Sequence, residues 1–467
     1  MNKFTHFYFL GIGGIGMSAI ARYYKTQGFE VAGYDRMHTM LTKTLETEGI
    51  YVTYEEAVTE IPQEYLDKNK TLVVLTPAIP NEHAQLRFFQ EKGYRIMKRA
   101  EILGSITRQS KGICISGTHG KTTTSTITAH LFKQSHVDCN AFLGGISNNY
   151  KSNLLLSKES NFVVIEADEY DRSFHHLTPY MAVITSADAD HLDIYETHQA
   201  MKESFAYFAS LVQPGGILII RKGIDINPEL QKGVKLFTYS MDEGGDFHAE
   251  NIRISPTEIK FDFVTPTDTI ADVRLGVPVK INVENSVAAM ALAWLGGVTS
   301  EELRTGLSSF SGVYRRFNVI YQDDNIVYID DYAHHPKELS AGIESIREMY
   351  PDKKITGIFQ PHLYTRTRDF VDEFAESLSA LDELILTDIY PARELPIEGV
   401  NPELVLSKMT LQNRMYCPKK SLLELIEQKD DLEVLVTFGA GDIEALVPQI
   451  RDILKAKKKD NNTDEMI

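Results

Sequence analysis

A glycine-rich segment at residues 112–124 carries the clearest chemical signal in the chain. An apolar run ends at Ser116, and the turn that follows consists of Gly117, Thr118, His119, Gly120, Lys121, Thr122 and Thr123. Glycines let backbone N–H groups approach a polyphosphate, Lys121 adds positive charge, and Thr122 offers a hydroxyl to Mg²⁺. Ile115 stands where the common P-loop pattern has its first glycine. We therefore expect a short-form phosphate loop for a nucleoside triphosphate, with a turn that binds nothing as the alternative.

A second glycine-rich turn lies near the N-terminus, between an apolar run at residues 7–10 and a helical pattern at residues 17–27. Its glycines are Gly11, Gly13, Gly14 and Gly16, and Asp35 ends the next strand pattern. This arrangement is typical of dinucleotide-binding turns, yet it suits any diphosphate attached to a ribose, including a UDP-linked substrate. A strand-to-helix turn without a ligand is the alternative.

Carboxylates follow two further apolar runs, at residues 166–171 and 188–193. Acidic side chains at the end of a buried strand lie where α/β sheets place their ligands, so we expect Glu166 to hold Mg²⁺ near a triphosphate. His191 stands among aspartates and could be a second metal ligand through its neutral imidazole. A solvated acidic loop and a surface histidine are the respective alternatives.

Polar pairs mark two other places in the chain. Asn282 and Asn285 stand at the start of a helical pattern, where they could cap the helix or contact a nucleobase. Arg315 and Arg316 lie near a predicted domain boundary, where they could be plain surface charge or could reach the γ-phosphate.

Two loops in the C-terminal third each follow a strand pattern. The first contains Asp331, Tyr332 and His334, and the second contains His362 and Arg366. Because carboxyl ends of parallel strands share one sheet edge, both loops can face one cleft, where Arg366 is suited to bind a carboxylate. Polar linkage between strand and helix is the alternative for each loop.

The elements that must position these residues are alternating strands and helices, which predicts an α/β fold with parallel sheets. We expect three domains, at residues 1–108, 109–313 and 314–467. An antiparallel patch is predicted for residues 234–278, where apolar residues alternate, and the charged tail at residues 455–467 is predicted to lack regular structure.

Composition narrows the possible functions. The formal net charge of −17, from 48 basic and 65 acidic residues, argues against binding to nucleic acid or to anionic membranes. Three cysteines without paired spacing indicate a reducing compartment, and neither a signal peptide nor a long apolar span is evident. We expect a cytoplasmic protein, and the sequence carries no signal for an oligomeric state.

Taken together, these motifs resemble those of the Mur ligase family along nearly the whole chain. The matching segments are residues 11–17, 117–124, 166–169, 190–193, 315–317, 331–336, 360–362, 364–366 and 439–443, with Asn282 and Asn285. The order of so many motifs is far more specific than any one of them. The short phosphate loop is this family's form, which accounts for the missing glycine.

The resemblance implies a Rossmann-like N-terminal domain that binds a UDP-linked substrate, a central P-loop ATPase-type domain and a Rossmann-like C-terminal amino-acid-binding domain. It implies ligation of L-alanine to the lactyl carboxyl of UDP-N-acetylmuramate, with ATP and Mg²⁺, in peptidoglycan precursor synthesis. It assigns phosphate and metal contacts to Lys121 and Thr122, and metal ligation to Glu166 and His191. Asn285 would lie beside adenine, and Tyr332, His334 and Arg366 near the amino acid and the muramyl carboxylate.

The chain departs from the family pattern at two positions. Ile281 replaces a frequent histidine, and Leu363 replaces a frequent arginine, which affects the expected adenine and muramyl contacts. Many relatives carry a carbamylated lysine, but the spacing of Lys202 does not fit one. Three alternatives remain at this point: a ligase of recycled peptides from the same family, a nicotinamide-dependent oxidoreductase, and a non-catalytic nucleotide sensor.

Overall fold

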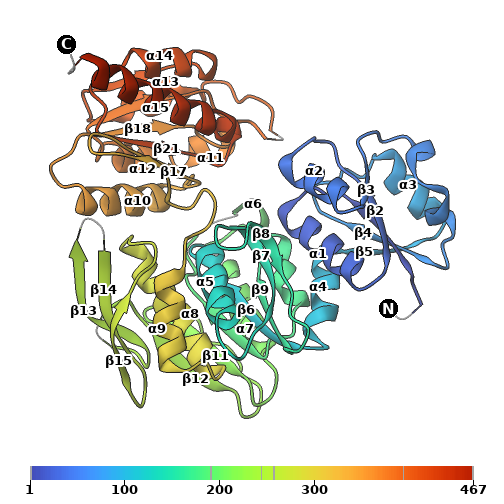
Figure 1. The fold of residues 1–467 in the computed structure, drawn as a ribbon. Coiled ribbons are helices and arrows are strands. Elements are labelled where there is room, and N and C mark those ends of the chain that lie inside the picture. Colours follow the sequence, from blue (N-terminus) through green and yellow to red (C-terminus); the bar gives the residue numbers. More distant parts are fainter. Residues whose placement is uncertain (1–2, 190–191, 243, 256–257, 393, 465–467) are drawn as a thin grey trace. The chain divides into compact units, whose positions relative to one another are not determined.

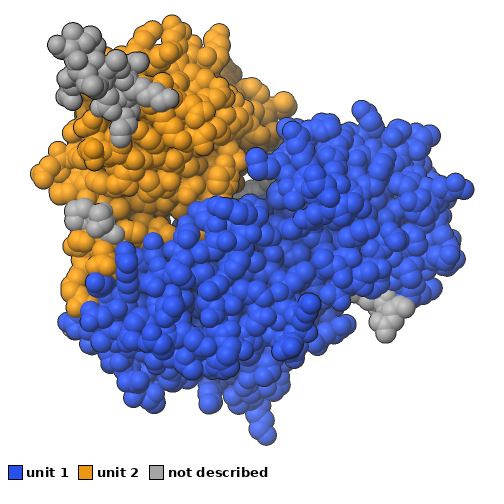
Figure 2. All heavy atoms as spheres, viewed as in Figure 1, with its two compact units in different colours: residues 1–252, 260–276, 283–311 blue, residues 253–259, 277–282, 312–467 orange. Residues whose placement is uncertain are grey.

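The computed structural model describes residues 3–189, 192–242, 244–255, 258–392 and 394–464. The chain divides into two compact units (Figure 2). The first unit comprises residues 1–252, 260–276 and 283–311, and the second comprises residues 253–259, 277–282 and 312–467. The predicted α/β class with mainly parallel sheets is confirmed.

The first unit begins with a five-stranded parallel sheet of order β3-β2-β1-β4-β5 (Figure 1). Its strands are β1 (His6–Leu10), β2 (Glu30–Tyr34), β3 (Tyr51–Thr53), β4 (Thr71–Leu75) and β5 (Arg95–Lys98). Its helices are α1 (Ile15–Thr26), η1 (Val58–Glu60) and η2 (Gln63–Leu66), both 3₁₀, α2 (Met40–Thr47), α3 (Ala84–Glu91) and α4 (Arg99–Thr107). Phe7 and Phe9 pack on the side of α1, whereas Tyr8 and Leu10 pack on the side of α3. Because alternate side chains point to opposite faces, both faces are covered in the Rossmann manner.

The same unit contains a seven-stranded sheet of order β12-β11-β10-β6-β9-β7-β8, in which β8 is antiparallel to β7 and the other pairings are parallel. Its strands are β6 (Lys111–Ser116), β7 (Asn140–Ser147), β8 (Ser152–Leu155), β9 (Phe162–Glu166), β10 (Met181–Ile184), β11 (Ile217–Arg221) and β12 (Lys235–Tyr239). Its helices are α5 (Lys121–Lys133), η3 (Tyr170–His176), α6 (Leu192–Tyr195), α7 (His198–Ser210), α8 (Ile281–Leu295) and α9 (Ser300–Ser309). The first two residues of α8 are grouped with the second unit. Ile113, Cys114 and Ile115 of the interior strand β6 are fully buried. The phosphate loop therefore leaves the sheet from its middle.

A small sheet of order β13-β14-β15 lies in the predicted antiparallel region. Its strands are β13 (His248–Ser255), β14 (Glu258–Val264) and β15 (Thr269–Arg274), and β14 pairs with β15 in antiparallel register. The prediction is wrong for β12, which pairs in parallel with β11 at the edge of the central sheet. An edge strand is only partly buried, so its apolar pattern was too weak to reveal this pairing.

The second unit contains a six-stranded sheet of order β16-β17-β21-β18-β19-β20, with β16 antiparallel to β17 and the other pairings parallel. Its strands are β16 (Asn318–Gln322), β17 (Val327–Asp331), β18 (Ile355–Phe359), β19 (Glu383–Leu386), β20 (Arg414–Tyr416) and β21 (Val434–Phe438). Its helices are α10 (Pro336–Met349), α11 (Tyr364–Asp369), α12 (Val371–Leu378), α13 (Pro402–Lys408), η4 (Lys419–Ser421), α14 (Leu422–Gln428), η5 (Asp442–Leu446) and α15 (Val447–Asp464). Ile329 of β17 packs with α10 and α12, while Tyr328 packs with α14 and α15. The alternation again shows a sheet covered on both faces.

Helix α15 corrects one prediction. The charged tail is helical through Asp464 rather than without regular structure, and residues 465–467 lie outside the described residues. Val447, Ile450 and Leu454 in the first half of α15 are buried against the sheet. The packing of this first half offsets the free-energy cost of nucleating the helix. The lysine-rich residues that follow can then continue it.

The three cysteines are free and buried: Cys114, Cys139 and Cys417. Among the described residues, no helix is both long and apolar enough to cross a bilayer.

Candidate active site

The phosphate loop depends on two glycines with backbone angles that other residues rarely adopt. Gly117 has φ +139° and Gly120 has φ +79°. A Cβ on Gly117 would collide with the Thr185 hydroxyl and with the backbone nitrogen of Ser186, while one on Gly120 would lie 2.7 Å from Asn285 Oδ1. The loop thus bends sharply between β6 and α5 and brings backbone N–H groups to the N-terminus of α5.

Lys121 makes two close contacts at the N-terminus of α5. Its Nζ donates to the Gly117 carbonyl at 2.5 Å and to the Glu169 carboxylate at 2.8 Å. Its side chain is 14% exposed, and Glu169 is buried. Burial alone would lower the pKa of Lys121, but Glu169, Asp168 and Glu166 together raise it. Lys121 is therefore a cation held in place by carboxylates of residues 166–171, the acidic loop that follows β9.

Thr122 and Glu166 converge as the sequence predicts for a metal site. Thr122 Oγ1 donates to Glu166 Oε1 at 3.0 Å, and Ser125 Oγ lies 3.4 Å from Glu166 Oε2. A Cβ on Gly144 would overlap the Glu166 carboxylate, so Gly144 makes the room in which that carboxylate lies. Hydroxyl and carboxylate oxygens are the hard donors that Mg²⁺ prefers, so these residues fit the ion. His191, the other predicted ligand, lies outside the described residues.

The remaining loop residues tie the turn to its neighbours. Thr118 Oγ1 and Ser186 Oγ are 2.8 Å apart, and the His119 backbone N–H donates to Ser186 Oγ at 2.7 Å. Thr123 lies half-buried in the first turn of α5. Ser186 was not predicted, because it follows a different strand, β10, and only the parallel pairing of β6 with β10 brings it to the loop.

The two asparagines at the start of α8 have different surroundings. Asn285 Oδ1 accepts a hydrogen bond from Thr124 Oγ1 at 3.3 Å, so it borders the phosphate loop. Asn282 belongs to the second unit, and its amide contacts the Val277 carbonyl at 3.5 Å. Within the first unit, the structure therefore brings Asn285 to the phosphate loop.

The acidic loop that follows β9 also contacts the start of α4. Arg99 donates to Asp168 Oδ2 at 2.9 Å, and Lys98 lies 3.3 Å from Asp171. Sequence reasoning missed both cations. Their only signal was a pair of basic residues at the start of a helical pattern, and about seventy intervening residues concealed their partners.

The first glycine loop leads from β1 into α1. Gly11 has φ +87°, and the Gly13 N–H donates to Asp35 Oδ2 at 2.7 Å. Gly14 directly precedes α1, and Gly16 lies in its first turn, where the Arg99 guanidinium occupies the space that a Cβ would need. The predicted residues are thus brought together around the N-terminus of α1, a position suited to an anion.

The second unit gathers the predicted C-terminal residues at one edge of its sheet. The rings of His334 and His362 have centroids 5.9 Å apart, and those of Tyr332 and His334 are 5.3 Å apart. This confirms that the loops after β17 and β18 meet, because β21 lies between these two strands and pairs in parallel with both. Arg366 lies in α11, and its charge affects His334.

The two arginines before β16 differ in what they can offer. Arg315 is buried, and its guanidinium donates to Asp330 at 3.0 Å and to the Gly439 carbonyl at 2.7 Å. Arg316 is 30% exposed and lies over the Tyr332 ring at 5.0 Å. Arg315 is thus engaged inside its unit, which favours Arg316 as the arginine that can reach a ligand.

Two titratable groups at this edge have shifted pKa values. Burial raises the pKa of Asp331 to about 7, against the opposing effect of Arg316. Burial lowers the pKa of His334; Glu338 opposes this shift, and Arg366 adds to it. At neutral pH His334 is therefore an uncharged imidazole that can accept a proton or a hydrogen bond.

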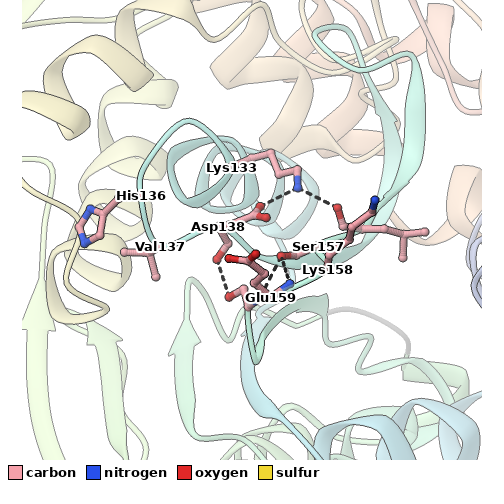
Figure 3. Close-up of a pocket in the computed structure, with 9 residues that line it drawn as sticks. Lys133, His136, Val137, Asp138, Ser157, Lys158 and Glu159 are labelled. Atoms are coloured by element: carbon pink, nitrogen blue, oxygen red, sulfur yellow. Dashed lines mark hydrogen bonds and ion pairs between the residues drawn. The ribbon is translucent and has the colours of Figure 1, made fainter.

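A cavity of about 410 Å³ lies elsewhere in the first unit, beside Lys133, Asp138 and Ser157 (Figure 3). Lys133 Nζ donates to Asp138 at 2.6 Å and to the Leu156 carbonyl at 2.8 Å, so its charge is already engaged. Lys133 ends α5, whereas the phosphate loop begins that helix. The cavity is therefore separate from the phosphate loop.

Comparison with known families matches the chain in three consecutive segments. Residues 6–111 match the model described as "Mur ligase family, catalytic domain", residues 115–293 the "Mur ligase middle domain", and residues 315–441 the "Mur ligase, glutamate ligase domain".

Curated relatives and solved structures agree with these matches. The chain is 56% identical to the UDP-N-acetylmuramate–L-alanine ligase of Parabacteroides distasonis, over 97% of this chain and 98% of the relative. It is 55% identical to the enzyme of that name from Phocaeicola vulgatus, over 98% of this chain and 100% of the relative. The solved structure of UDP-N-acetylmuramate-alanine ligase from Thermotoga maritima has a TM-score of 0.81, at 26% identity, covering 97% of this chain and 99% of its own.

Proposed function

Because the chain belongs to the Mur ligase family, we propose that it catalyses the ATP-dependent ligation of L-alanine to UDP-N-acetylmuramate, a step in peptidoglycan precursor synthesis. The observation that carries this proposal is the full-length similarity to ligases of that name, at 55–56% identity. The reducing compartment inferred from its cysteines, which are all free, supports a cytoplasmic location.

We assign the binding of the three substrates to three parts of the chain. Residues 1–108 would bind the UDP-linked substrate, residues 109–313 would bind ATP, and residues 314–467 would bind the amino acid. The three consecutive family matches support this division.

The chemistry requires activation of a carboxylate. The lactyl carboxylate does not react with an amine directly, so its oxygen first attacks the γ-phosphorus of ATP, ADP leaves, and an acyl phosphate forms. The uncharged amine of L-alanine then attacks the acyl carbon, and the tetrahedral intermediate collapses with loss of inorganic phosphate. Phosphoryl transfer depends mainly on charge neutralisation and alignment.

The phosphate loop supplies much of that neutralisation. Gly117, Thr118, His119, Gly120 and Thr123 would present backbone N–H groups and hydroxyls to the phosphates, and Lys121 would place its ammonium against them. Thr122 and Glu166 would hold Mg²⁺, together with His191. Bound there, the ion would add positive charge beside the phosphate oxygens.

The other predicted residues take binding roles. Asn282, Asn285 and Asp331 would contact the nucleotide, with Arg316 as the cation that stabilises the transferring phosphoryl group. Arg315, predicted as a nucleotide contact, is instead engaged with Asp330 and the Gly439 carbonyl. Gly11, Gly13, Gly14, Gly16 and Asp35 would contact the diphosphate and ribose of the UDP-linked substrate. Tyr332, His334, His362 and Arg366 would bind the amino acid and the muramyl carboxylate, and Arg366 offers the bidentate geometry that a carboxylate needs.

The proposal is tested by mixing the protein with ATP, MgCl₂, UDP-N-acetylmuramate and, in separate reactions, L-alanine, L-serine, glycine or a tripeptide, and by measuring product mass. We expect the alanyl product, with phosphate release that needs both the UDP-sugar and the amino acid. Phosphate release at full rate from ATP alone would overturn the proposal, as would a product formed only with a tripeptide. Tight binding of a reduced nicotinamide, measured by the change in its fluorescence, would instead favour an oxidoreductase.

A further inference from the structure

The acidic loop after β9 holds two different partners at once. Glu166 and Glu169 contact the phosphate loop, through Thr122 at 3.0 Å and Lys121 at 2.8 Å. Asp168 and Asp171, in alternation with them, pair with Arg99 and Lys98 at the start of α4. The loop therefore joins the phosphate loop to the N-terminal sheet of the same unit.

Arg99 is the member of this network that reaches the first glycine loop. Its guanidinium lies directly against Gly16, in the first turn of α1, and donates to Asp168. Its side chain is 21% exposed and that of Asp168 is 37% exposed, so both can reach solvent or a ligand. A guanidinium beside a helix N-terminus adds a permanent, fork-shaped positive charge where a diphosphate would bind.

The backbone of the acidic loop is held by its own contacts. The Tyr195 hydroxyl donates to the Glu169 carbonyl at 2.6 Å, and the Phe174 N–H donates to the Asp168 carbonyl at 2.9 Å. Asp171 and Arg172 both adopt positive φ, 52° and 53°. A change of partner at Asp168 would therefore alter charge beside the phosphate loop without requiring the loop to move.

We propose that Arg99 is a positioning residue that binds the diphosphate of the UDP-linked substrate and, through Asp168, couples occupancy of the first glycine loop to occupancy of the phosphate loop. When the guanidinium turns to the diphosphate, Asp168 loses its ion pair. Its negative charge, two residues from Glu166 and no longer offset by Arg99, then attracts Mg²⁺ more strongly to the Thr122 and Glu166 oxygens, and the nucleotide binds with that ion. The inference rests on the proposed function for the identity of the substrate.

The coupling is measured by titrating Mg²⁺ and a non-hydrolysable ATP analogue into the full chain, with and without saturating UDP-N-acetylmuramate, by calorimetry. For the wild type we expect the analogue to bind at least about fivefold more tightly when the UDP-sugar is present. The UDP-sugar should bind more tightly by the same factor when the analogue is present. Arg99→Ala should weaken UDP-sugar binding by about tenfold or more and bring the coupling factor to one. Asp168→Asn removes the ion pair that the guanidinium must otherwise give up, so it should bind the UDP-sugar at least as tightly as the wild type and still bring the coupling factor to one.

Two further variants separate this role from a structural one. Arg99→Lys should recover part of the UDP-sugar affinity, because it keeps the charge without the fork. Lys98→Ala is the matched control, since it removes a neighbouring ion pair that does not touch the glycine loop, and it should behave as the wild type. In turnover, Arg99→Ala should raise KM for the UDP-sugar more than it lowers kcat.

Unchanged UDP-sugar affinity in Arg99→Ala, or wild-type coupling in Asp168→Asn, would overturn the proposal, as would a wild type without coupling. If Arg99→Ala does not fold, Arg99→Lys and Asp168→Asn decide. A wild type that forms no alanyl product, while the Arg99 variants still lose UDP-sugar affinity, would overturn the proposed function and leave this inference standing.

Discussion

Thr122 places its hydroxyl 3.0 Å from the Glu166 carboxylate, and this contact predicts how the enzyme responds to magnesium. Thr122→Val keeps the shape of the side chain and removes an oxygen from the expected metal site. We expect the MgCl₂ concentration for half-maximal rate to rise by about tenfold. Initial rates over a magnesium titration provide the measurement. Thr122→Ser, which keeps the hydroxyl, is the control, and a valine variant that titrates as the wild type would contradict the assignment.

Asp331 predicts a pH dependence of stability. Burial raises its pKa in the folded protein to about 7, so between pH 4 and pH 7 the folded state holds a proton that the unfolded state has released. Stability therefore falls as pH rises through this window, by at most about 4 kcal/mol. Asp331→Asn should remove this penalty and unfold at a higher temperature than the wild type at pH 8 but not at pH 4. A calorimetric difference that is the same at both pH values would show that Asp331 does not titrate in this range.

At the scale of residues, the sequence predicted those contacts that lie within one motif or between loops that directly follow neighbouring strands. Lys121, Thr122 and Glu166 meet because two neighbouring parallel strands end side by side, which a strand-and-loop pattern predicts. Arg99 could not be found in this way. Its role depends on packing between α4 and a loop of another sheet, and local patterns carry no information about such contacts.

At the scale of elements, the turn from β6 to α5 predicts a strict need for glycine. Gly117→Ala would place a Cβ against the backbone of residues 185 and 186 at φ +139°, so the turn must distort. We expect a loss of stability of about 2 kcal/mol or more and a loss of ATP affinity, measured by denaturant unfolding and calorimetric titration. Gly28→Ala is the control, because Gly28 has φ +86° with open space around it, and it should lose only about 1 kcal/mol.

Strands buried on both faces were the most predictable elements. The patterns at 355–359, 383–386 and 434–438 coincide with β18, β19 and β21, because apolar runs of this length bounded by turns have few other solutions. The helix pattern at 336–349 coincides with α10, which His335 caps and Pro336 begins. Strands β5, β7, β8, β16 and β20 were missed because partly buried or polar residues obscure their alternation.

At the scale of the whole molecule, the contacts of Asn153 join the central sheet of the first unit to α1 of its N-terminal sheet. Its amide donates to the Ile15 carbonyl at 2.5 Å and to Ser18 Oγ at 3.1 Å, and the residue is fully buried. Asn153→Ala would leave these groups without that donor, so we expect amide hydrogen exchange in α1 and β8 to speed up several-fold. Exchange in the second unit should not change. Asn140→Ala, in the same sheet but bonded to Ser160, is the control, and equal protection of α1 in both variants would contradict the prediction.

The division into units shows where pattern reasoning ends. Alternating strands and helices indicated an α/β protein with several sheets. The grouping of residues 253–259 and 277–282 with the C-terminal sheet rather than with their neighbours in sequence was not foreseen. Such grouping depends on which surfaces pack together in space, and short local segments do not encode it.

The placement of the cysteines gives the protein built-in reporters. Cys114 and Cys139 lie sealed within the first unit, and Cys417 lies within the second. Burial raises the thiol pKa of all three, so a maleimide dye should label the native enzyme only as fast as each region opens. Peptide mapping after brief exposure to the dye would then show which unit opens first. Bound nucleotide should slow labelling of Cys114 and should not change the rate at which Cys417 is labelled. Equal protection at both sites would indicate that the halves open together.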